Sequence, residues 1–476
     1  MVAGFEEMIG AVSNIIWSYV LIAVLIGIGL FFTIKTKFVQ FSYFGEMIRV
    51  LFEKDSMKAS KKGTAPFQAF TMSVASRVGT GNLAGVASAV ALGGPGAVFW
   101  MWIIALVGAA SGFIESTLAQ VYKEPGKDSY RGGPAYYMEK GLKSRKLGVT
   151  FAIIITFTYG LVFNAVQSNT IRAAFGESFG TDKFVMAIIL AVLTAIVIFG
   201  GVRRVASVTG ILIPVMAILY LVMAFFALAL NITELPSILA LIVTNAFGIQ
   251  EVLGGGFGAA ILMGVKRGLF SNEAGMGSAP NAAATAEVTH PVKQGLIQSF
   301  AVFTDTILIC TATAFIILTS GEPASYMNTD LDGIQITQAA FGTVVGEWAN
   351  MFIAVAIFLF AFSSVVGNYY YGETNIQFIK DTKLGLTFYR LAVVAMVVFG
   401  AMVKVSVVWT MADLAMGVMA LINLYAIARL YPVAVAALND YRKQRKAGKN
   451  PVFHKDNIET NHDLEYWDSN QQSQNV

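Results

Sequence analysis

Eleven long apolar segments decide what this chain can fold into. Each approaches or exceeds the roughly 20 mostly apolar residues that a helix needs to cross a bilayer, and they lie at 14–34, 66–91, 95–121, 149–171, 184–200, 206–230, 252–289, 296–319, 347–372, 385–403 and 405–428. Hydrophobic residues make up 56% of the 476 residues and charged residues only 13%, whereas an ordinary soluble domain is about 25% charged. The sequence therefore predicts an all-α, multi-pass membrane protein and excludes a soluble enzyme or a nucleic-acid-binding protein.

Disulfide and metal chemistry find little support in the sequence. Cys310 is the single cysteine, so no intrachain disulfide can form. The three histidines, at 290, 454 and 462, are too scattered to suggest a metal site. The N-terminus lacks the basic region of a cleavable signal peptide, so we expect the first apolar segment to remain as a span. We expect neither an enzyme nor an organic cofactor.

The basic residues predict the orientation in the membrane. With the N-terminus outside, 26 of the 33 Lys and Arg residues fall in the segments 35–62, 122–148, 200–205, 290–295, 373–384 and the tail from 429. The opposite side holds three, Arg172, Lys183 and Lys404. Loops rich in Lys and Arg face the cytoplasm, so we expect a cytoplasmic-membrane protein with its N-terminus outside and its C-terminus inside. Residues 440–476, basic and then acidic and amide-rich, are predicted to form a solvated cytoplasmic tail.

Two predicted spans contain stretches that favour a broken helix. They are Ser-Arg-Val-Gly-Thr-Gly-Asn at 76–82 and Gly-Leu-Phe-Ser-Asn-Glu-Ala-Gly-Met-Gly-Ser-Ala-Pro-Asn at 268–281. Irregular backbone within a bilayer is tolerated only where it lines a cavity or is buried in protein. Freed carbonyls can coordinate a hard cation, and freed N–H groups at a half-helix N-terminus can hold a carboxylate. Close helix packing through Gly81 and Gly85 is the structural alternative.

The positions of the breaks indicate a transporter. They fall in the second and seventh spans, so each opens one of two five-helix halves that begin on opposite sides of the membrane. Paired broken helices in inverted repeats mark the substrate site of a secondary transporter. We predict an accessory helix and loop at 1–65, repeats at 66–230 and 231–430, and a cytoplasmic tail at 431–476.

Polar residues within the spans are candidates for binding. Asn164, Gln167 and Asn169 can hydrogen-bond a ligand without a buried charge, or can simply join helices. Ser363 and Ser364 can supply oxygens to Na⁺, or can bond carbonyls one turn back in their own helix. Asn368 lies one turn beyond the serines, where it could contact a substrate. Intramembrane acids are usually functional, and the candidates are Glu115, Glu273 and Asp305, with Arg77 or Lys266 as alternative partners for Glu273.

Five motifs give the chain a family resemblance. They are the two glycine-rich stretches at 76–82 and 268–280, with Gly-Gly-Pro-Gly-Ala-Val-Phe-Trp-Met-Trp (93–102), Arg-Gly-Gly-Pro-Ala-Tyr-Tyr (131–137) and Tyr-Tyr-Gly-Glu (370–373). Across 10–440 the chain resembles the alanine or glycine:cation symporter family. The resemblance implies sodium-coupled uptake of a small neutral amino acid, through the 5+5 inverted-repeat fold of the leucine transporter type with one extra N-terminal helix.

The same resemblance implies roles for individual residues. Thr80 and Gly81 would hold the substrate's carboxylate or amine, Gln167 would hydrogen-bond it, and Phe270 and Ala274 would line the apolar side. A sodium site would use the carbonyls of Ala75 and Val78 with the hydroxyls of Ser363 and Ser364. Candidate coupling residues are Asn82, Asn272, Glu273 and Asp305.

One position departs from the family pattern and bears on the substrate. Alanine-carrying members commonly have Gly-Trp before the Tyr-Tyr-Gly-Glu block, whereas here Gly367 is followed by Asn368. A carboxamide leaves more room than an indole and adds hydrogen-bonding capacity, so glutamine becomes the leading candidate substrate over alanine. A proton-coupled amino acid transporter using Glu273 and Asp305 is the nearest alternative. An ion channel is disfavoured, because a single chain with inverted halves lacks the symmetry of a pore.

Overall fold

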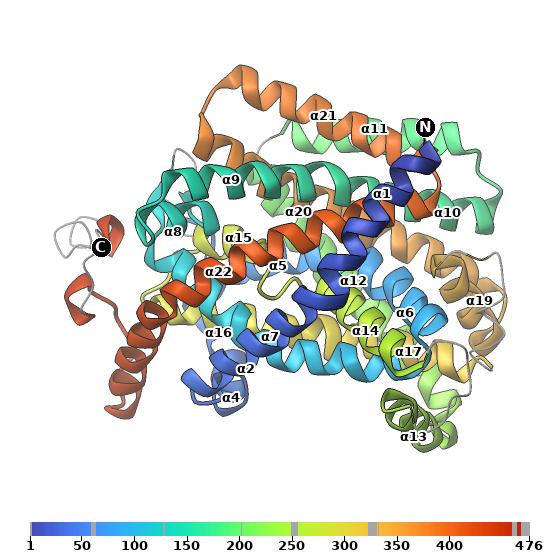
Figure 1. The fold of residues 1–476 in the computed structure, drawn as a ribbon, viewed down its shortest axis with the longest axis horizontal. Helices are drawn as coiled ribbons and strands as arrows, with labels where there is room; N and C mark the ends of the chain where they lie inside the picture. The colour runs from blue at the N-terminus through green and yellow to red at the C-terminus, as the bar shows by residue number, and fades with distance from the viewer. Residues whose placement is uncertain are drawn as a thin grey trace.

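The computed structural model describes residues 2–58, 63–126, 129–200, 202–248, 256–321, 331, 333–458 and 464–467. Most of its long helices run along the longest axis of the molecule, and the two chain ends lie toward opposite ends of that axis (Figure 1). The named strands of the described residues are the short antiparallel pair β1 (Glu124–Pro125) and β2 (Tyr130–Arg131). The expected all-α architecture is confirmed.

Helices occupy most of the described chain. Up to the first break they are α1 (Val2–Ile15), η1 (Ile16–Leu21), α2 (Ile22–Lys35), α3 (Val39–Ser42), α4 (Phe44–Leu51), η2 (Lys54–Met57) and α5 (Pro66–Arg77). Next come η3 (Gly81–Gly85), α6 (Val86–Gly93), α7 (Gly96–Val121), α8 (Pro134–Lys140), α9 (Arg145–Ile155), η4 (Thr156–Phe163), α10 (Asn164–Phe179), α11 (Lys183–Ile198), α12 (Val202–Leu230), η5 (Ile232–Glu234) and α13 (Leu235–Ala246). The remainder are α14 (Gly256–Asn272), α15 (Ala279–Thr285), α16 (Pro291–Val302), η6 (Phe303–Cys310), α17 (Thr311–Thr319), α19 (Gly333–Val345), α20 (Trp348–Ile379), α21 (Lys383–Met402), α22 (Val405–Lys446), η7 (Lys455–Asn457) and η8 (Glu465–Trp467).

Local sequence signals explain where several helices begin. Pro66, Pro134 and Pro291 each occupy the first helical position of α5, α8 and α16, where the missing N–H costs no helical hydrogen bond. Asp182 caps α11 by accepting a hydrogen bond of 2.8 Å from the Phe184 N–H. The segments η1, η3, η4 and η6 are π-helical turns inside longer helices, a feature that is frequent at functional sites.

Seven helices of the described chain are long and apolar enough to cross a membrane, or up to eight if the bent pair 214–230 and 232–246 counts as one span. The other expected spans have helical counterparts that are short or interrupted. The segment 184–200 forms the short apolar helix α11, and the segments 66–91 and 252–289 are broken. Residues 252–255 of the seventh predicted span lie outside the described residues. A bend of 76° separates the helix 232–246, which includes α13, from the end of α12.

The molecule is polar at its centre and apolar on its flanks. Large apolar side chains such as Ile188, Val222 and Leu391 are exposed on α11, α12 and α21, whereas Glu115 and Asp305 are fully buried. A lipid bilayer favours this distribution, because its hydrocarbon core solvates apolar but not polar groups. The fold is therefore that of a membrane-embedded protein.

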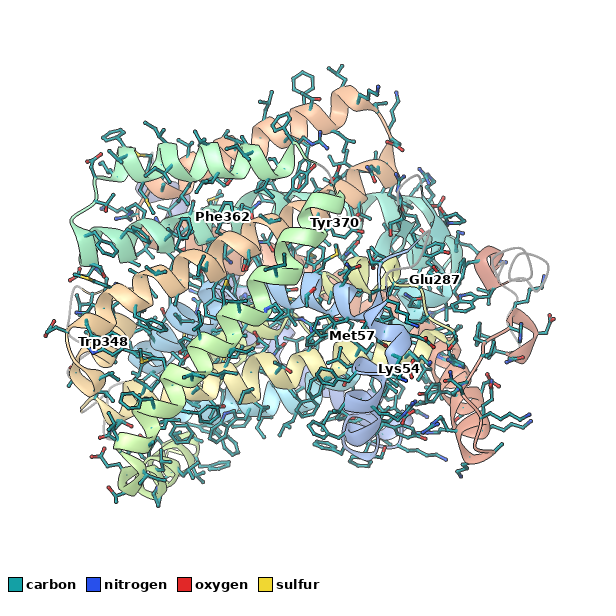
Figure 2. The ribbon with its side chains drawn as sticks, turned by 180° about the vertical axis from the view of Figure 1, so that it is seen from behind. Lys54, Met57, Glu287, Trp348, Phe362 and Tyr370 are labelled. Carbon is teal, nitrogen blue, oxygen red and sulfur yellow. The ribbon has the colours of Figure 1, made fainter. Side chains whose placement is uncertain are left out.

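One end of the molecule gathers the basic segments, and we call it the basic end. It holds residues 35–58, 129–146, 285–293 and 440–458. Ion pairs of 2.6 Å between Lys293 and Glu53 and of 3.0 Å between Arg445 and Glu46 join its parts. Figure 2 shows Lys54, Met57 and Glu287 toward this end and Trp348, the first residue of α20, at the other.

The chain after the last predicted span differs from expectation. The helix α22 continues to Lys446, well beyond residue 428. Gly448 then turns the chain with a φ of 72°. Phe453, Leu464 and Trp467 are buried, whereas residues 442–450 are all exposed or half-buried. The prediction of a solvated tail therefore fails for these three apolar side chains and agrees with the basic run. Residues 459–463 and 468–476 lie outside the described residues.

Candidate functional site

The first predicted break is confirmed. The helix α5 ends at Arg77, the chain bends at Val78 and Gly79, and helix resumes at Thr80 with η3 and then α6. The side chain of Asn82 stabilises the bend, because its Oδ1 accepts a hydrogen bond of 2.9 Å from the Gly79 N–H. The expected interruption at 76–82 therefore lies chiefly at two residues.

The second predicted break is also confirmed, over a shorter stretch than 268–281. Helix α14 runs on to Asn272, residues 273–278 are irregular, and α15 begins at Ala279. Glu273 adopts a φ of 56°, a left-handed conformation that costs a residue with a Cβ atom about 1–3 kcal/mol. Strain of this kind is found where surrounding structure holds a functional site in place.

The two breaks lie against each other. The hydroxyl of Ser76 lies 2.7 Å from Glu273 Oε1 in the other break, and Ser278 Oγ donates to Glu273 Oε2 at 2.7 Å. A Cβ atom added at Gly81 would lie 3.1 Å from Phe270 Cδ1 and 3.1 Å from Ser271 Cα. Gly81 therefore permits a close approach of the two breaks, which a side chain at this position would crowd.

Glu115 in α7 holds the irregular backbone of the second break. Its two carboxylate oxygens accept hydrogen bonds of 3.1 Å from the N–H groups of Gly275 and Gly277. The Asn423 Nδ2 atom donates to the same carboxylate at 2.8 Å and to the Gly275 carbonyl at 2.9 Å. The partners of Glu115 thus make it a positioning residue for the break.

Oxygens of α5, of the bend that follows it and of α20 lie beside the first break. Ser364 Oγ lies 2.9 Å from the Ala75 carbonyl, 3.3 Å from the Val78 carbonyl and 3.1 Å from the Phe360 carbonyl. Ser363 Oγ donates to the Phe360 carbonyl at 2.7 Å. The structure therefore brings Ser364 together with the carbonyls of Ala75 and Val78, and adds the Phe360 carbonyl, which the sequence analysis missed. The hydrogen bond of the Ser363 hydroxyl stays within α20.

The amide side chains of α10 have separate partners. Gln167 Oε1 accepts hydrogen bonds from Thr80, at 3.1 Å from the backbone N–H and at 2.8 Å from the hydroxyl. Asn169 Nδ2 donates to the carbonyls of Gly400 and Val403 at 2.8 Å, which joins α10 to α21. Asn164 Nδ2 bonds the carbonyl of Gly160 in its own helix at 2.9 Å. Among these three amides, Gln167 is the one that contacts a break.

Two buried carboxamide groups near the breaks have an N–H₂ group without a partner. Asn368 Oδ1 lies 2.7 Å from Ser76 Oγ, while its Nδ2 atom contacts no acceptor. Asn272 Oδ1 accepts from the Ala274 N–H at 3.0 Å, and its Nδ2 atom is likewise unpartnered. Burying such donors without a partner is unfavourable, which makes both side chains candidates for donating to a ligand.

Asp305 forms a polar cluster on the other side of the breaks. It accepts hydrogen bonds from Asn82 Nδ2 at 2.6 Å, from Ser271 Oγ at 2.7 Å and from Thr306 Oγ1 at 2.9 Å. Asn82 and Ser271 belong to the two broken spans, so this carboxylate joins both. Cys310 Sγ lies 3.3 Å from Asn82 Nδ2 within the same cluster.

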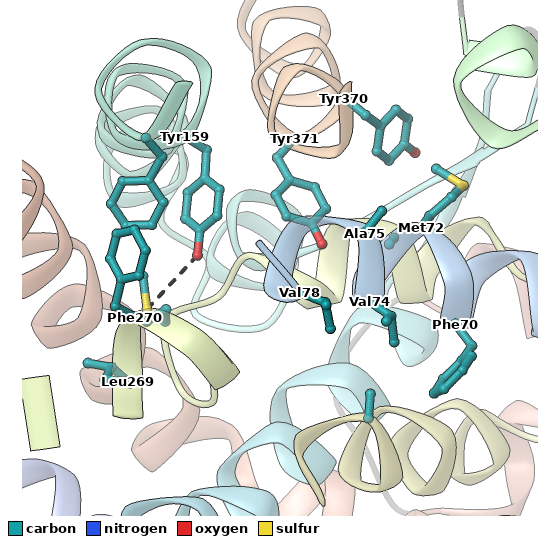
Figure 3. Close-up of a cluster of buried hydrophobic side chains, with 14 of the residues drawn as sticks. Phe70, Met72, Val74, Ala75, Val78, Tyr159, Leu269, Phe270, Tyr370 and Tyr371 are labelled. Carbon is teal, nitrogen blue, oxygen red and sulfur yellow. Dashed lines mark hydrogen bonds between the residues drawn. The ribbon is translucent and has the colours of Figure 1, made fainter. Parts of the chain in front are cut away.

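Aromatic rings border the site. Phe270 lies 4.7 Å, between ring centroids, from both Phe163 and Trp409. Figure 3 shows Tyr159 beside Phe270, with Tyr371 of α20 pointing toward Val78. Ala274, expected to line the same apolar side, instead belongs to a separate cluster that it forms with small residues of α7 and with Val302.

An ion cluster that the sequence analysis missed lies next to Trp409. Arg267 contacts Asp413 at 3.1 Å and Lys266 contacts it at 3.4 Å. The Arg267 guanidinium stacks over the Trp409 ring at 4.1 Å. Trp17 of η1 donates to the Asp413 carbonyl at 3.0 Å. The sequence signals that could have found this cluster were the acid Asp413 in the last span and the basic pair at 266–267 in the seventh span. The alternative pairing of Lys266 with Glu273 is wrong, because Lys266 contacts Asp413.

Arg77 contributes a buried positive charge near the site. It is 1% exposed and donates to the Gln298 carbonyl at 3.3 Å. Its charge attracts the carboxylates of Glu115, Glu273 and Asp305. The central region thus holds three buried acids near one guanidinium, and the carboxyl group of Glu273 is hydrogen-bonded to the hydroxyls of Ser76 and Ser278.

Two facing broken helices inside a helical membrane protein define a secondary transporter of the leucine-transporter fold. The fold resembles that of a Na⁺-coupled sialic acid symporter solved in its substrate-bound, outward-open state, with a TM-score of 0.50 at 13% identity over 87% of this chain and 86% of that one. At that identity the likeness establishes the fold alone.

The chain belongs to the sodium:alanine symporter family, whose profile matches residues 2–455. It is 57% identical over 98% of its length to the amino-acid carrier protein AlsT of Bacillus subtilis, covering 99% of that protein. The probable sodium/glutamine symporter GlnT of the same organism is 53% identical, with 97% of this chain and 96% of GlnT covered. The sodium/alanine symporter AgcS of Methanococcus maripaludis is 36% identical, with 93% and 98% covered. The protein is therefore a transporter and not an enzyme.

Proposed function

We propose that this chain imports a small neutral amino acid together with Na⁺, with glutamine as the leading substrate. The observation that carries the proposal is the meeting of two broken helices beside a convergent set of oxygens. Backbone groups freed at such breaks provide N–H donors for a carboxylate and carbonyls for an alkali ion. The family membership supports symport, and this meeting of the breaks supports the site that we propose for it.

The substrate's α-carboxylate would bind at the first break. Thr80 presents its N–H and its hydroxyl as donors, and Gln167 accepts both in this structure. Gly81 follows at the start of the outer half-helix, where the helix dipole favours negative charge. A bound carboxylate would take over these donors, and Gln167 would then contact the ligand.

The substrate side chain would extend between Phe270 and the two free carboxamides. Phe270 supplies an apolar wall for methylene groups. The unpartnered Nδ2 atoms of Asn368 and Asn272 can donate to a side-chain carbonyl. Glutamine offers both features and alanine offers neither, and the 53% identity to a probable sodium/glutamine symporter supports this choice. Ala274 would contribute to the substrate site only from the side that faces α7.

Sodium would bind among the carbonyls of Ala75, Val78 and Phe360 and the hydroxyls of Ser363 and Ser364. Each hydroxyl has lone pairs that can turn toward a cation. Ala75 lies in the last turn of α5 and Val78 in the first break, next to the residues that would bind the carboxylate. An ion that orders this backbone also completes the substrate site, and differential binding of this kind couples the two ligands.

Alternating access would follow from the repeats, which we place at 66–230 and 231–430 with 1–65 as an accessory helix and loop. The first two spans of each repeat, α5 to α7 and α14 to α17, would rock against the rest. Within the described chain, α7 packs on α14 and α16, whereas α10 packs on α20 and α21. We assign the basic end to the cytoplasm. Trp409 and the Arg267–Asp413 pair would then close the outer side.

The sodium gradient supplies enough driving force. One charge crossing 100 mV is worth about 2.3 kcal/mol, and a tenfold gradient adds about 1.4 kcal/mol. Together these permit roughly 500-fold accumulation of substrate per sodium ion. A single sodium site is therefore sufficient for concentrative uptake.

One observation favours proton coupling as a second candidate. The Ser76 hydroxyl has one proton, yet it lies 2.7 Å from acceptor oxygens of both Glu273 and Asn368. A proton held on Glu273 would satisfy both contacts, since Glu273 would donate to Ser76 and Ser76 to Asn368. Asp305 has donors around both of its oxygens and fits a carboxylate.

Uptake of radiolabelled glutamine and alanine into proteoliposomes tests these proposals. We expect saturable uptake that stops when choline replaces sodium at fixed pH, and competition by glutamine at lower concentration than by alanine. Saturable alanine uptake that excess glutamine leaves unchanged would contradict the substrate. Uptake that survives in choline and follows a pH gradient would favour the proton-coupled alternative.

A further inference from the structure

The chain folds back on itself after α22. The Phe453 N–H donates to the Thr289 carbonyl at 2.9 Å, and the Thr289 hydroxyl donates to the Pro451 carbonyl at 2.9 Å. The Phe453 ring is fully buried and lies 5.2 Å from the ring of His290, the residue that caps α16. Residues 451–458 therefore pack on the connection between α15 and α16.

A second contact lies at the far end of the folded-back chain, at Trp467. The Trp467 indole is fully buried and donates to the Gln120 carbonyl of α7 at 3.0 Å. Together with Tyr130 and Tyr466, Trp467 encloses the Lys123 ammonium, which lies 4.5, 4.2 and 5.3 Å from the centroids of Tyr130, Tyr466 and Trp467 respectively. The Phe453 and Trp467 rings are 5.2 Å apart, so the two contacts form one unit.

The enclosed residues secure the end of the second broken span. Lys123 Nζ donates to the Ala286 carbonyl at 2.8 Å and Gln120 Nε2 donates to it at 3.0 Å, directly after α15 ends at Thr285. Thr64, which precedes α5, pairs with Ala286 in a β-bridge. The halves of both broken spans that point to the basic end are thus joined at one place, under the folded-back chain.

The folded-back residues connect two groups of helices. They continue from α22, to which Val452 is tied by hydrogen bonds of 2.9 and 2.8 Å with the Gln444 side chain. Their far contacts, Thr289 and Gln120, belong to the connection after α15 and to α7. In the proposed mechanism, on which this inference rests, α7 and α15 move and α22 does not. Any opening at the basic end would therefore have to break these contacts or move the folded-back residues together with α7 and α15.

We propose that residues 451–458 and 464–467 form a latch that holds the basic end closed and must release before the site opens there. In the latched structure the chain between the breaks and the basic end is sealed, since Ser278, Asn281 and Thr285 are at most 1% exposed. The latch would set the rate of inward opening without contacting the substrate or sodium.

Trp467→Ala tests the latch by removing the indole hydrogen bond and the ring contacts. We expect equilibrium exchange of radiolabelled substrate in proteoliposomes to become about tenfold faster, the effect of one buried hydrogen bond and one aromatic pair. Trp467→Phe keeps the ring and should have a smaller effect. Tyr425→Ala is the matched control, because Tyr425 is exposed on the side of α22. Exchange by Trp467→Ala at the wild-type rate would overturn the proposal.

A reversible cross-link provides a test that does not depend on weakening the fold. The pair Thr289→Cys and Val452→Cys joins the latch to the moving group, and we expect oxidation to block exchange and reduction to restore it. The pair Gln444→Cys and Val452→Cys joins the latch only to α22 and should leave exchange unchanged. Full exchange by the oxidised 289–452 pair would rule the latch out.

The latch and the proposed function can fail separately. Variants of the latch should retain the sodium dependence and the order of competing amino acids measured for the native chain. A native chain without sodium-dependent uptake would contradict the proposed function. Normal sodium-dependent uptake with no effect of either latch variant would contradict the latch alone.

Discussion

The hydroxyl of Ser364 lies 2.9 Å from the carbonyl oxygen of Ala75, although 289 residues separate them in the chain. One belongs to α20 and the other to the last turn of α5, so the contact joins the two groups of helices that would move relative to each other. A cation bound between them would be an electrostatic connection across that boundary. The relative stability of the outward-open and inward-open arrangements of these two groups would then depend on the sodium concentration.

Removal of the Ser364 hydroxyl should weaken sodium binding selectively. We expect Ser364→Ala to raise the half-saturating sodium concentration by about tenfold, since an oxygen that contacts a charge is worth about 1.5–3 kcal/mol. Sodium activation of uptake at saturating substrate measures the effect. Thr343→Ala, which removes an exposed hydroxyl bonded only within its own helix, is the control. A sodium activation curve equal to that of the native chain would contradict the assigned site.

Substitution of Asn368 should change substrate preference rather than sodium dependence. Asn368→Leu keeps the size but removes the free N–H₂ group, so we expect half-saturation for glutamine to rise about tenfold while that for alanine changes little. Asn368→Trp should fill the space of the side chain and favour alanine over glutamine. Competition assays measure both preferences, and an unchanged glutamine-to-alanine ratio in both variants would disprove the assignment.

A methyl group at Gly81 should separate the two breaks. The added carbon of Gly81→Ala would lie 3.1 Å from both Phe270 and Ser271, and overpacking of this kind costs about 1–3 kcal/mol. We expect substrate binding to fall at least tenfold in an equilibrium binding assay. Gly27→Ala is the control, because nothing lies within 4 Å of its added carbon. Native affinity in Gly81→Ala would show that the contact between the breaks is dispensable.

The carboxylate of Glu115 should be required for the shape of the second break. Glu115→Gln keeps the size but leaves the N–H of Gly275 or Gly277 without an acceptor, at a cost of about 1–3 kcal/mol. We expect a lower melting temperature in detergent and reduced uptake. Glu347→Gln, on the exposed surface, should melt as the native protein does. Equal melting temperatures for both variants would show that Glu115 does not support the break.

The latch should respond to pH at the basic end. Burial lowers the pKa of Lys123 to about 7, partly opposed by Glu287, and release into water would return the pKa toward its ordinary value of about 10.4. Between about pH 7 and 10, release of the latch is therefore accompanied by protonation of Lys123, so a rising pH favours the latched form. Below about pH 7 the side chain is protonated in both forms, and the pH dependence ends. The facing Tyr130 and Tyr466 stay neutral there, because burial raises the pKa of each.

Exchange measured at pH 7 and pH 9 on the basic side tests this dependence. We expect native exchange to slow at pH 9. Lys123→Met lacks the titrating group and should show the same rate at both values. Equal slowing in both proteins would assign the pH dependence to another group.

Glycine and polar residues inside apolar runs made the central site predictable from sequence. The irregular stretches at 76–82 and 268–281 could be located because a bilayer permits broken helix only under special conditions. Ser364 could be joined to Ala75 and Val78 only through the family resemblance, since no local pattern relates residues so far apart. The structure then brought these three residues together.

Other features depend on tertiary contacts that no sequence period records. Asn164, Gln167 and Asn169 look alike in sequence, yet Asn164 bonds within its own helix, Gln167 bonds Thr80 at the first break and Asn169 bonds the end of α21. The basic and amide-rich composition after residue 440 indicated solvent exposure, but a few aromatic side chains outweigh it by packing on the basic end. Phe453 and Trp467 are single residues in a polar sequence, so composition gives them little weight.

The single cysteine has a practical consequence. Cys310 Sγ lies 3.1 Å from Ser271 Oγ, between the broken spans and Asp305, and is 2% exposed. Because the native chain offers this one thiol, a maleimide reagent would modify the protein only when the central region admits water. The unaltered transporter therefore carries a built-in chemical probe of its own opening, which mass spectrometry could follow without any engineered label.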